Sequence, residues 1–511
     1  MARQILIVGG GTAGWITAGY LARMLSAQLP GGVQITLIES DDIGIIGVGE
    51  GTFPSIRKTL KRIGVDESDL VRDCDATFKQ GIRFDGWRTG TGESYFHPFE
   101  APFSPGGLDL LSYWLAGVAG DRQWDAASTV QTHAADMGLA PKLQSHEAYA
   151  APLNYAYHFD AAKLARLLRR VAIGNGVRHC IGTISEVCLT PEGAVDHLVS
   201  REQGEMRADL YIDCTGFSAR LIGQSLGSPY RSVRGSLFTN RAVALQVPYD
   251  RPDRPIPSFT LSTAQTAGWT WDIGLDNRRG TGYVYSTDHT SDAEAEAVLR
   301  RYIGPAADQL TARVLNFEPG YRPVQWQKNV VAIGLSAGFL EPLEATGIGF
   351  AEGAALVLAT LFPWSGPIDG PAQQFNDIMV RRYAHVVDFI KMHYCLTRRT
   401  DTAFWCDNAQ DSTIPDSLQA RLERWRYRVP DFVDVDLNHD IFTEANWQYV
   451  LYGMGFRTDI QARAGALKYA DDARAAFADI PRQAAIARTK LPSHRDLIEA
   501  VRRQGFRRAA A

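Results

Sequence analysis

The sequence predicts an α/β fold: a Rossmann-like dinucleotide-binding module, an inserted β-sheet region and a helical C-terminal region. Three observations lead to this prediction. A β-branched segment at residues 4–8 runs directly into a glycine loop. Two further apolar segments, 209–216 and 329–334, each end in a polar or glycine turn. Beyond residue 372, apolar residues recur at three- and four-residue intervals, which is the period of amphipathic helices.

The first elements are a buried parallel strand at 4–8 and a helix over 15–25. The glycines between them fit G-x-G-x-x-G, a motif in which they allow a tight turn, close approach of a pyrophosphate and close packing of the helix. The pyrophosphate would bind at the helix N-terminus. The candidate cofactor contacts are Gly9, Gly11, Thr12, Ala13 and Gly14.

A second strand, at 34–38, ends at Glu39. A carboxylate at this point can accept hydrogen bonds from a ribose diol. Together the two strands, the glycines and the acid predict a dinucleotide site, although they do not distinguish FAD from NAD.

Composition narrows the class of protein. The chain has 511 residues, of which 45% are hydrophobic and 22% charged, as is typical of soluble globular proteins. A net charge of −4 gives no indication of nucleic acid or an anionic membrane as a partner. Six cysteines without a CxxC pair predict free thiols in a reducing compartment, so we expect a cytoplasmic protein without a metal site.

A lysine, Lys79, stands in the apolar stretch 76–84, which predicts its partial burial. A buried ammonium is costly unless it is paired, and its pKa falls readily. The alternative is a side chain that reaches the surface. Upstream, Gly49 and Glu50 belong to a glycine-rich segment at 47–55, which a plain loop explains equally well.

Residues 336–349 read SAGFLEPLEATGIG and precede a helix predicted over 350–361. Consecutive backbone N–H groups at such a helix start can bind an anion, although an ordinary N-cap is the alternative. Further back, Trp269 and Trp271 are one residue apart, so strand alternation places both on one face. Paired indoles of this kind can also be core.

Taken together, these segments resemble the flavin-dependent tryptophan halogenase family. The match covers the glycine loop, Lys79, residues 341–347 and residues 269–274, where Gly274 replaces the proline of the family motif W-x-W-x-I-P. The resemblance implies FAD as the nucleotide, with the segment 47–55 as a flexible loop over the flavin and further contacts at Gly49, Glu50, Gly334, Gly347 and Ile348. It also implies chloride or bromide at Thr346 and Gly347.

The resemblance implies a reaction as well. Reduced FAD from a separate flavin reductase, O2 and the halide would yield hypohalous acid. Lys79 would direct this oxidant to an electron-rich aromatic ring, and Glu344 would polarise it or accept the ring proton. Trp269 and Trp271 would separate the flavin from the substrate.

The substrate prediction rests on a difference from the family. Members that act on free tryptophan carry a Tyr-Tyr pair in a region that here reads 432–444, without such a pair. We therefore expect indole-like or bulkier aromatics to be better substrates than free tryptophan. Candidate ring contacts, each of which core packing would also explain, are Phe99, Trp114, Phe442 and Trp447.

The predicted organisation is a discontinuous FAD module interleaved with a substrate sheet over 1–371 and a helical, substrate-covering region over 372–511. Helices are expected at 375–394, 417–427, 438–455 and 471–491. The protein is expected to be a monomer or homodimer. Two other functions stay open from the sequence: a flavin-dependent aromatic hydroxylase and a non-catalytic flavoprotein.

Overall fold

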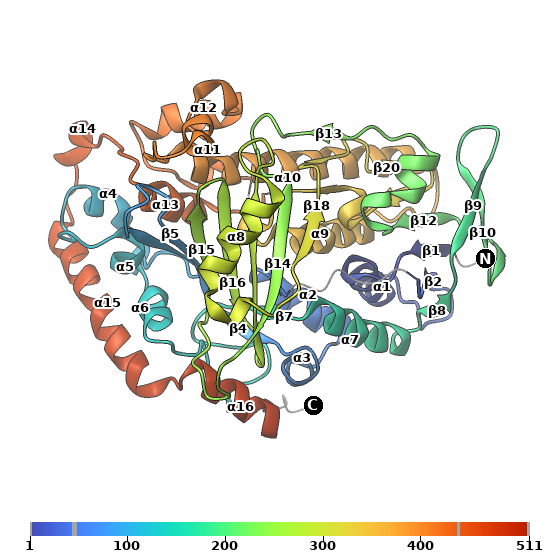
Figure 1. Ribbon diagram of the computed structural model, residues 1–511, viewed down its shortest axis with the longest axis horizontal. Coiled ribbons are helices and arrows are strands. Elements are labelled where there is room, and N and C mark those ends of the chain that lie inside the picture. Colours follow the sequence, from blue (N-terminus) through green and yellow to red (C-terminus); the bar gives the residue numbers. More distant parts are fainter. Residues whose placement is uncertain (1–2, 43–48, 437–439, 508–511) are drawn as a thin grey trace. The chain divides into compact units, whose positions relative to one another are not determined.

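The computed structural model describes residues 3–42, 49–436 and 440–507 (Figure 1). The chain forms two compact units, each assembled from three segments. Unit 1 comprises Met1–Ala76, Phe159–Val233 and Phe317–Tyr383, and unit 2 comprises Thr77–His158, Arg234–Asn316 and Ala384–Ala511. Both units contain helices and sheets, so the predicted α/β class is confirmed. The functional division at residue 371 stays a prediction.

The main sheet of unit 1 has six strands in the order β20-β21-β12-β1-β2-β8. Its neighbours are parallel from β21 to β8, and β20 runs antiparallel at one edge. The strands are β1 (Gln4–Val8), β2 (Gln34–Glu39), β8 (Arg178–Ile181), β12 (Leu210–Asp213), β20 (Trp326–Gln327) and β21 (Val330–Ala332). The strands expected at 4–8 and 34–38 are therefore present within one residue, and the apolar segments 209–216 and 329–334 contain β12 and β21.

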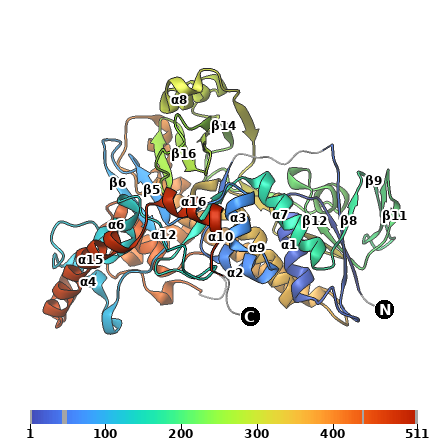
Figure 2. The ribbon, with the colours of Figure 1, turned by 90° about the horizontal axis from the view of Figure 1, so that it is seen from below.

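Helix α1 (Thr12–Met24) follows β1 at once and packs against α7 (Ala161–Gly174) and α9 (Thr346–Thr360) (Figure 2). Because neighbours cover it, α1 is buried continuously from Gly14 to Ala22. Two shorter helices, α2 (Ser55–Ile63) and α3 (Glu67–Asp73), contact α1 and α7 respectively. Small three-stranded sheets complete the unit: β9 (Ile184–Leu189), β10 (Val195–Ser200), β11 (Gly204–Met206), and β13 (Arg231–Ser232), β19 (Gly320–Tyr321), β22 (Gly338–Phe339).

Unit 2 is built on a seven-stranded sheet in the order β18-β14-β17-β16-β15-β5-β6, in which only β15 and β5 are parallel neighbours. This is the predicted inserted sheet. Its strands are β5 (Gly81–Asp85), β6 (Ser94–Pro98), β14 (Arg241–Pro248), β15 (Thr260–Gln265), β16 (Gly268–Gly274), β17 (Arg278–Tyr285) and β18 (Arg313–Asn316). Separately, β4 (Thr77–Lys79) pairs antiparallel with β7 (Ala156–Phe159).

Helices supply most of the chain beyond residue 369, as predicted. They are α10 (Asp369–Cys395), within which the boundary between the units falls, α11 (Ala403–Asn408), α12 (Asp416–Trp425), α13 (Glu444–Gly453), α14 (Gln461–Ala464), α15 (Ala470–Lys490) and α16 (His494–Gln504). Earlier helices of unit 2 are α4 (Leu110–Leu115), α5 (Trp124–Ser128), α6 (Val130–Asp136) and α8 (Asp292–Ile303).

One predicted helix begins later than expected. The pattern indicated a helix from 438 to 455, but α13 begins at Glu444. The reason is a capping box, in which Thr443 and Asn446 satisfy each other's backbone N–H groups. Residues 437–439 lie outside the described residues.

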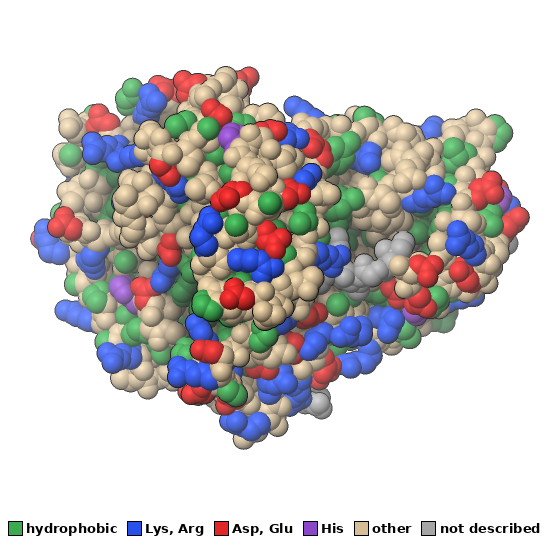
Figure 3. Space-filling view, viewed as in Figure 1, with side chains coloured by type: hydrophobic (Ala, Val, Ile, Leu, Met, Phe, Trp, Pro, Cys, Tyr) green, Lys and Arg blue, Asp and Glu red, His purple; other side chains and the backbone are tan. Residues whose placement is uncertain are grey.

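Basic and acidic side chains are interspersed over the face seen in Figure 3, in keeping with the small net charge of −4. Across residues 3–42, 49–436 and 440–507, no helix has both the length and the apolar character needed to cross a membrane.

Candidate functional site

The glycine loop of unit 1 is shaped by backbone contacts. Gly9 has a φ of 112°, and a Cβ there would lie 2.2 Å from the carbonyl oxygen of Cys214. A Cβ at Gly14 would lie 2.0 Å from the carbonyl oxygen of Gly9. Both positions therefore require glycine.

Gly11 differs, because a Cβ there would meet no atom within 4 Å. It is the N-cap of α1. Because glycine has no side chain, it does not cap the N–H groups of the first helical turn. Open space beside uncapped N–H groups at the positive end of the helix suits a pyrophosphate. Thr12 and Ala13 form the first turn of this helix.

Glu39 ends β2 beside the glycine loop, since a Cβ at Gly10 would lie 1.5 Å from its Oε2 atom. Its Oε1 atom accepts a hydrogen bond of 2.8 Å from Nε2 of His179, a partner that the sequence did not indicate. Gly334 also approaches the loop: its φ is 81°, and a Cβ there would lie 2.7 Å from the Cβ of Ala13. The residues present therefore fit a bound dinucleotide.

The predicted flavin-contacting loop is described only in part, because Gly47 and Val48 lie outside the described residues. Gly49 has a φ of 78° and leads into β3 (Glu50–Gly51). Burial, followed by the charge of Asp160, raises the pKa of Glu50 to about 7. Further along, Phe53 packs on α9, since a Cβ at Gly349 would lie 2.2 Å from its ring.

The start of α9 fits an anion. Ala345 adopts a left-handed conformation, with a φ of 56° and a ψ of 35°, and turns the chain into the helix. The hydroxyl of Thr346 is fully buried and has no hydrogen-bond partner among the described residues. Space is open beside Gly347, and the next residue, Ile348, is buried. An orphaned hydroxyl donor beside the N–H groups of a helix start is a suitable halide ligand set.

Glu344 immediately precedes this turn and is 3% exposed. In the second turn of α9, Glu352 Oε2 accepts a hydrogen bond of 3.2 Å from the Ser55 hydroxyl of α2. Burial raises the pKa of Glu352 to about 7. Sequence reasoning missed Glu352, although an acid in an otherwise apolar helix was a usable signal.

In unit 2, Lys79 is the last residue of β4 and is only 1% exposed, more buried than predicted. Its Nζ atom lies 5.4 Å from the centre of the Phe99 ring, within the range of a cation–π interaction. Two predicted site residues thus come together.

The backbone of Phe99 is held on both sides. Its N–H donates to Oε1 of Gln131 at 2.7 Å, and its carbonyl accepts from Nδ2 of Asn154 at 2.8 Å. Gln131 also donates to the backbone carbonyl of Asn154, which joins the two clamps. Neither residue had a sequence signal, because amides far along the chain reach Phe99 only in the fold.

The other predicted aromatic residues lie in two clusters. Phe442 stacks on Phe389 with the two ring centres 3.9 Å apart. Trp447 meets the Phe389 ring edge-on, with the ring centres 4.9 Å apart. Trp114 instead packs 5.7 Å from Trp124. Phe442 and Trp447 are buried and Trp114 is half-buried, and the role of all three as substrate contacts stays a prediction.

His97 was missed. It lies two residues before Phe99 on β6, accepts a 2.9 Å hydrogen bond from Nδ2 of Asn446, and has its ring centre 5.9 Å from that of Phe389. The spacing of two residues from Phe99 was the available signal.

The two tryptophans lie on one face of β16, with ring centres 6.3 Å apart and exposures of 1% for Trp269 and 5% for Trp271. Gly282 faces Trp271 on β17, and a Cβ there would lie 2.1 Å from the indole. A side chain at 282 would therefore displace the ring.

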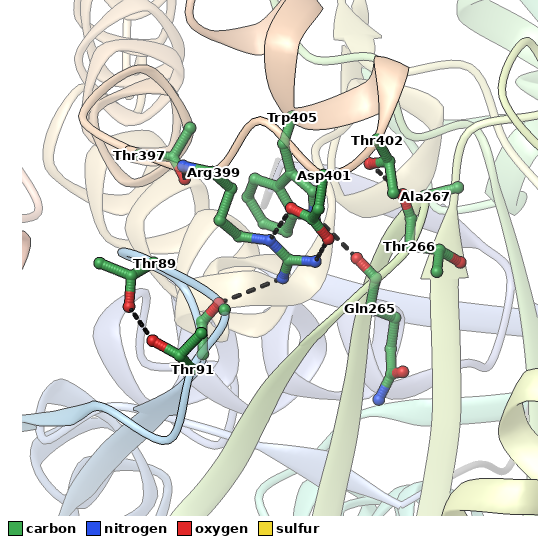
Figure 4. Close-up of polar contacts among 12 residues, drawn as sticks. Thr89, Thr91, Gln265, Thr266, Ala267, Thr397, Arg399, Asp401, Thr402 and Trp405 are labelled. Atoms are coloured by element: carbon green, nitrogen blue, oxygen red, sulfur yellow. Dashed lines mark hydrogen bonds and ion pairs between the residues drawn. The ribbon is translucent and has the colours of Figure 1, made fainter.

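The turn before β16 is clamped by the segment after α10 (Figure 4). Arg399 forms a bidentate ion pair with Asp401, donates to the carbonyl of Gly86 and stacks 4.5 Å over Trp405. Trp405 in turn donates to the carbonyl of Gln265 at 2.8 Å. This arrangement supports the end of the sheet that carries Trp269.

Gly274, where the family motif has proline, is explained by close packing. A Cβ there would lie 2.7 Å from Cγ2 of Ile256. A close approach, and not a left-handed backbone, therefore accounts for the small residue at this position.

A cavity of about 510 Å³ lies elsewhere in unit 2 and includes none of the predicted site residues. Part of its lining is Glu100, Val130, Leu153, Ile480 and Lys490.

Comparison with known proteins gives a consistent result. A family model described as tryptophan halogenase matches residues 4–468. The tryptophan 6-halogenase SttH of Streptomyces toxytricini is 36% identical over 474 residues, covering 88% of this chain and 89% of the relative. The 7-chloro-L-tryptophan 6-halogenase KtzR of Kutzneria sp. (strain 744) is 35% identical, covering 98% and 99%. A solved tryptophan halogenase from Shewanella frigidimarina NCIMB 400 has a TM-score of 0.95, 41% identity and 99% coverage of both chains.

Three findings define the enzyme class: the sheet with its dinucleotide-binding loop, the start of α9 that fits an anion, and these matches. The class is that of the flavin-dependent halogenases. The chain belongs to the tryptophan halogenase family. It is an oxidoreductase that uses reduced FAD and a halide, so the predicted family, enzyme class and cofactors are confirmed. The hydroxylase and the non-catalytic flavoprotein are not supported. Enzymes of this family need a separate flavin reductase and act on aromatic substrates.

Proposed function

We propose that this halogenase substitutes an indole or another electron-rich aromatic ring and that Lys79 holds the oxidant. The observation that carries this proposal is the buried Lys79 side chain, whose Nζ lies 5.4 Å from the centre of the Phe99 ring. Reduced flavin, when bound, supplies hypohalous acid from O2 and the halide. An ammonium group can donate hydrogen bonds to that oxidant and orient it, whereas an apolar side chain cannot.

We assign the halide to Thr346 and Gly347, and proton transfer to Glu344. The buried hydroxyl of Thr346 without a partner supports the first assignment. The burial of the Glu344 carboxyl, 3% exposed, supports the second, because a general base works best where water is excluded. Trp269 and Trp271 stay the proposed wall between flavin and substrate.

The relatives named above act on tryptophan or 7-chlorotryptophan, by their names. For this chain we propose that indole-like or bulkier aromatics are better substrates than free tryptophan. The absence of a Tyr-Tyr pair from residues 432–444 supports this proposal. A kcat/KM for free tryptophan above that for indole would contradict it.

We also propose a cytoplasmic monomer or homodimer that has no nucleic-acid or membrane partner. Support comes from six free cysteines, as expected in a reducing compartment, and from the small net charge of −4.

The experiment that tests the role of Lys79 uses a matched pair of variants. Lys142 is also fully buried in unit 2, and its Nζ lies 4.0 Å from the centre of the Phe506 ring. Lys79→Met and Lys142→Met therefore each remove a buried ammonium from an aromatic contact. Each purified variant receives FAD, NADH, a flavin reductase, chloride or bromide, and indole, and halogenated product is measured by mass spectrometry.

We expect Lys79→Met to lose at least about 100-fold in product formation, as for the loss of an orienting catalytic group. Lys142→Met is expected to keep activity in proportion to its folded fraction. Equal activity of Lys79→Met and wild type would overturn the assignment. Equal losses in both variants would attribute the effect to destabilisation.

A further inference from the structure

The strand that carries Lys79 is tied to the strand that carries the two tryptophans. Thr77 Oγ1, in β4, donates a 2.6 Å hydrogen bond to the carbonyl oxygen of Gly274, the last residue of β16. The two strands are not neighbours in one sheet, so this bond directly links β4, the strand that carries Lys79, to the strand of Trp269.

A second link runs through His494 at the start of α16. Its ring is fully buried. Nδ1 lies 2.9 Å from the carbonyl oxygen of Ile256, and Nε2 lies 2.9 Å from the backbone nitrogen of Phe78. A carbonyl can only accept, so Nδ1 carries the proton, and the bare Nε2 accepts from the Phe78 N–H. Both ring nitrogens are thus used, and each in one defined role.

Ile256 connects Gly274 to His494. Its side chain lies against Gly274, where a Cβ would come within 2.7 Å of Ile256 Cγ2. The contacts therefore run from Thr77 to Gly274, to Ile256, to His494 and back to Phe78. We call these five residues the His494 junction. The glycine that departs from the family motif is part of it.

The junction needs a neutral imidazole. Burial lowers the pKa of His494 to about 4, and the nearby charge of Arg495 acts in the same direction. His158, opposite Thr77 on β7, also faces this region, and burial together with Lys79 and His494 holds its pKa well below the usual value. Near neutral pH, Nε2 therefore stays an acceptor for Phe78.

We propose that His494 is a positioning residue for halogenation: it holds the Phe78 amide, and through it Lys79, in register with the strand of Trp269 and Trp271. The inference rests on the proposed role of Lys79. Its physical basis is that a reacting group displaced by about 1 Å loses on the order of 100-fold in rate. The two residues that precede Lys79 in β4 are thus both anchored, Thr77 by its side chain and Phe78 by its backbone N–H.

Two substitutions at one position separate the two hydrogen bonds. His494→Asn places an amide near the position of Nδ1, where it can still donate to the Ile256 carbonyl. It provides no acceptor for the Phe78 N–H. His494→Gln can place an oxygen near Nε2 and restore that acceptor. Thr77→Val removes the hydrogen bond to the Gly274 carbonyl at nearly constant volume. His289 is the matched control, since both its ring nitrogens are bonded, to Ser286 and Asp407, elsewhere in unit 2.

Four quantities are measured for each variant: kcat and KM for indole, halogenated product per mole of reduced flavin consumed, the unfolding midpoint, and hydrogen exchange of the peptide containing Phe78. We expect His494→Asn to lower kcat and product per flavin by about 10- to 100-fold with little change in KM, and to speed exchange at Phe78. His494→Gln should recover most of the kcat, Thr77→Val should lose about 10-fold, and His289→Asn should retain wild-type kcat.

Two results would overturn the inference: wild-type kcat and product yield in folded His494→Asn, or equal losses in the Asn and Gln variants that follow the unfolding midpoint. If the proposed role of Lys79 is wrong, Lys79→Met keeps its activity. If only the proposed role of His494 is wrong, Lys79→Met is inactive while His494→Asn stays active. Faster exchange at Phe78 reports on the junction without any turnover.

Discussion

At the scale of single residues, Thr346 has a fully buried hydroxyl with no partner among the described residues. Leaving such a group unsatisfied costs about 1–3 kcal/mol. A ligand bound at the Thr346 hydroxyl would offset this energetic cost. The backbone N–H groups at the start of α9 can donate to the same ligand.

Thr346→Val should therefore stabilise the ligand-free protein by about 1 kcal/mol and raise the half-saturating chloride concentration about tenfold. Urea unfolding and the chloride dependence of product formation test the two parts. Thr360→Val, at the exposed end of the same helix, is the control and should alter neither quantity. Tighter use of chloride by Thr346→Val would contradict the assignment.

Gly282 gives a second residue-scale prediction. A Cβ there would lie 2.1 Å from the indole of Trp271, so Gly282→Ala should displace that ring. We expect a loss of roughly 1–3 kcal/mol in the free energy of unfolding, with a shift in tryptophan fluorescence. Gly235→Ala, where a Cβ meets nothing within 4 Å, is the comparison. Similar stability and fluorescence in both variants would rule out the close contact.

At the scale of elements, a single buried carboxyl links α9 to α2. Glu352 accepts from Ser55, and its pKa is raised by burial to about 7. Between about pH 4.5 and 7 the folded state keeps a proton that the unfolded chain has released. The free energy of unfolding therefore falls as pH rises through this window, by about 3 kcal/mol for one group.

Glu352→Gln cannot titrate, so it should remove that loss. Relative to wild type, it should be more stable at about pH 8 by up to about 3 kcal/mol and nearly equal at about pH 4.5. Urea titrations at the two pH values measure the difference. Because Glu50, whose pKa is also raised, is present in both proteins, its contribution cancels. A pH-independent difference would show that Glu352 is ionised throughout.

At the scale of the whole molecule, unit 2 depends on three distant segments. Its sheet comes from the first two, while the third supplies Trp405, bonded to Gln265, and His494, bonded to Phe78. A fragment of residues 1–371 should thus lack a cooperative unfolding transition, since the sheet of unit 2 loses these partners. Calorimetry and ANS fluorescence of the fragment test this, and a sharp transition with little dye binding would show that it folds independently.

The elements that could be predicted are those with local signals. Strand 4–8, the glycine loop and α1 follow from a β-branched run, required glycines and helical periodicity, all within a few residues. The start of α13 was missed, because a capping box between Thr443 and Asn446 outweighed the apolar pattern before it. In the candidate site, Lys79 and Thr346 were predicted from motifs, whereas no motif pointed to His97, Gln131 or His494.

The sequence by itself determined the class of this protein, since glycines, paired tryptophans and a lysine in an apolar stretch carry their chemistry in short, contiguous motifs. Only the tertiary structure decided how those motifs are held. His494 lies 416 residues from Phe78, and Gly274 is a glycine because Ile256 lies against it. Such contacts depend on which distant segments pack together, and no local pattern of side chains encodes that pairing.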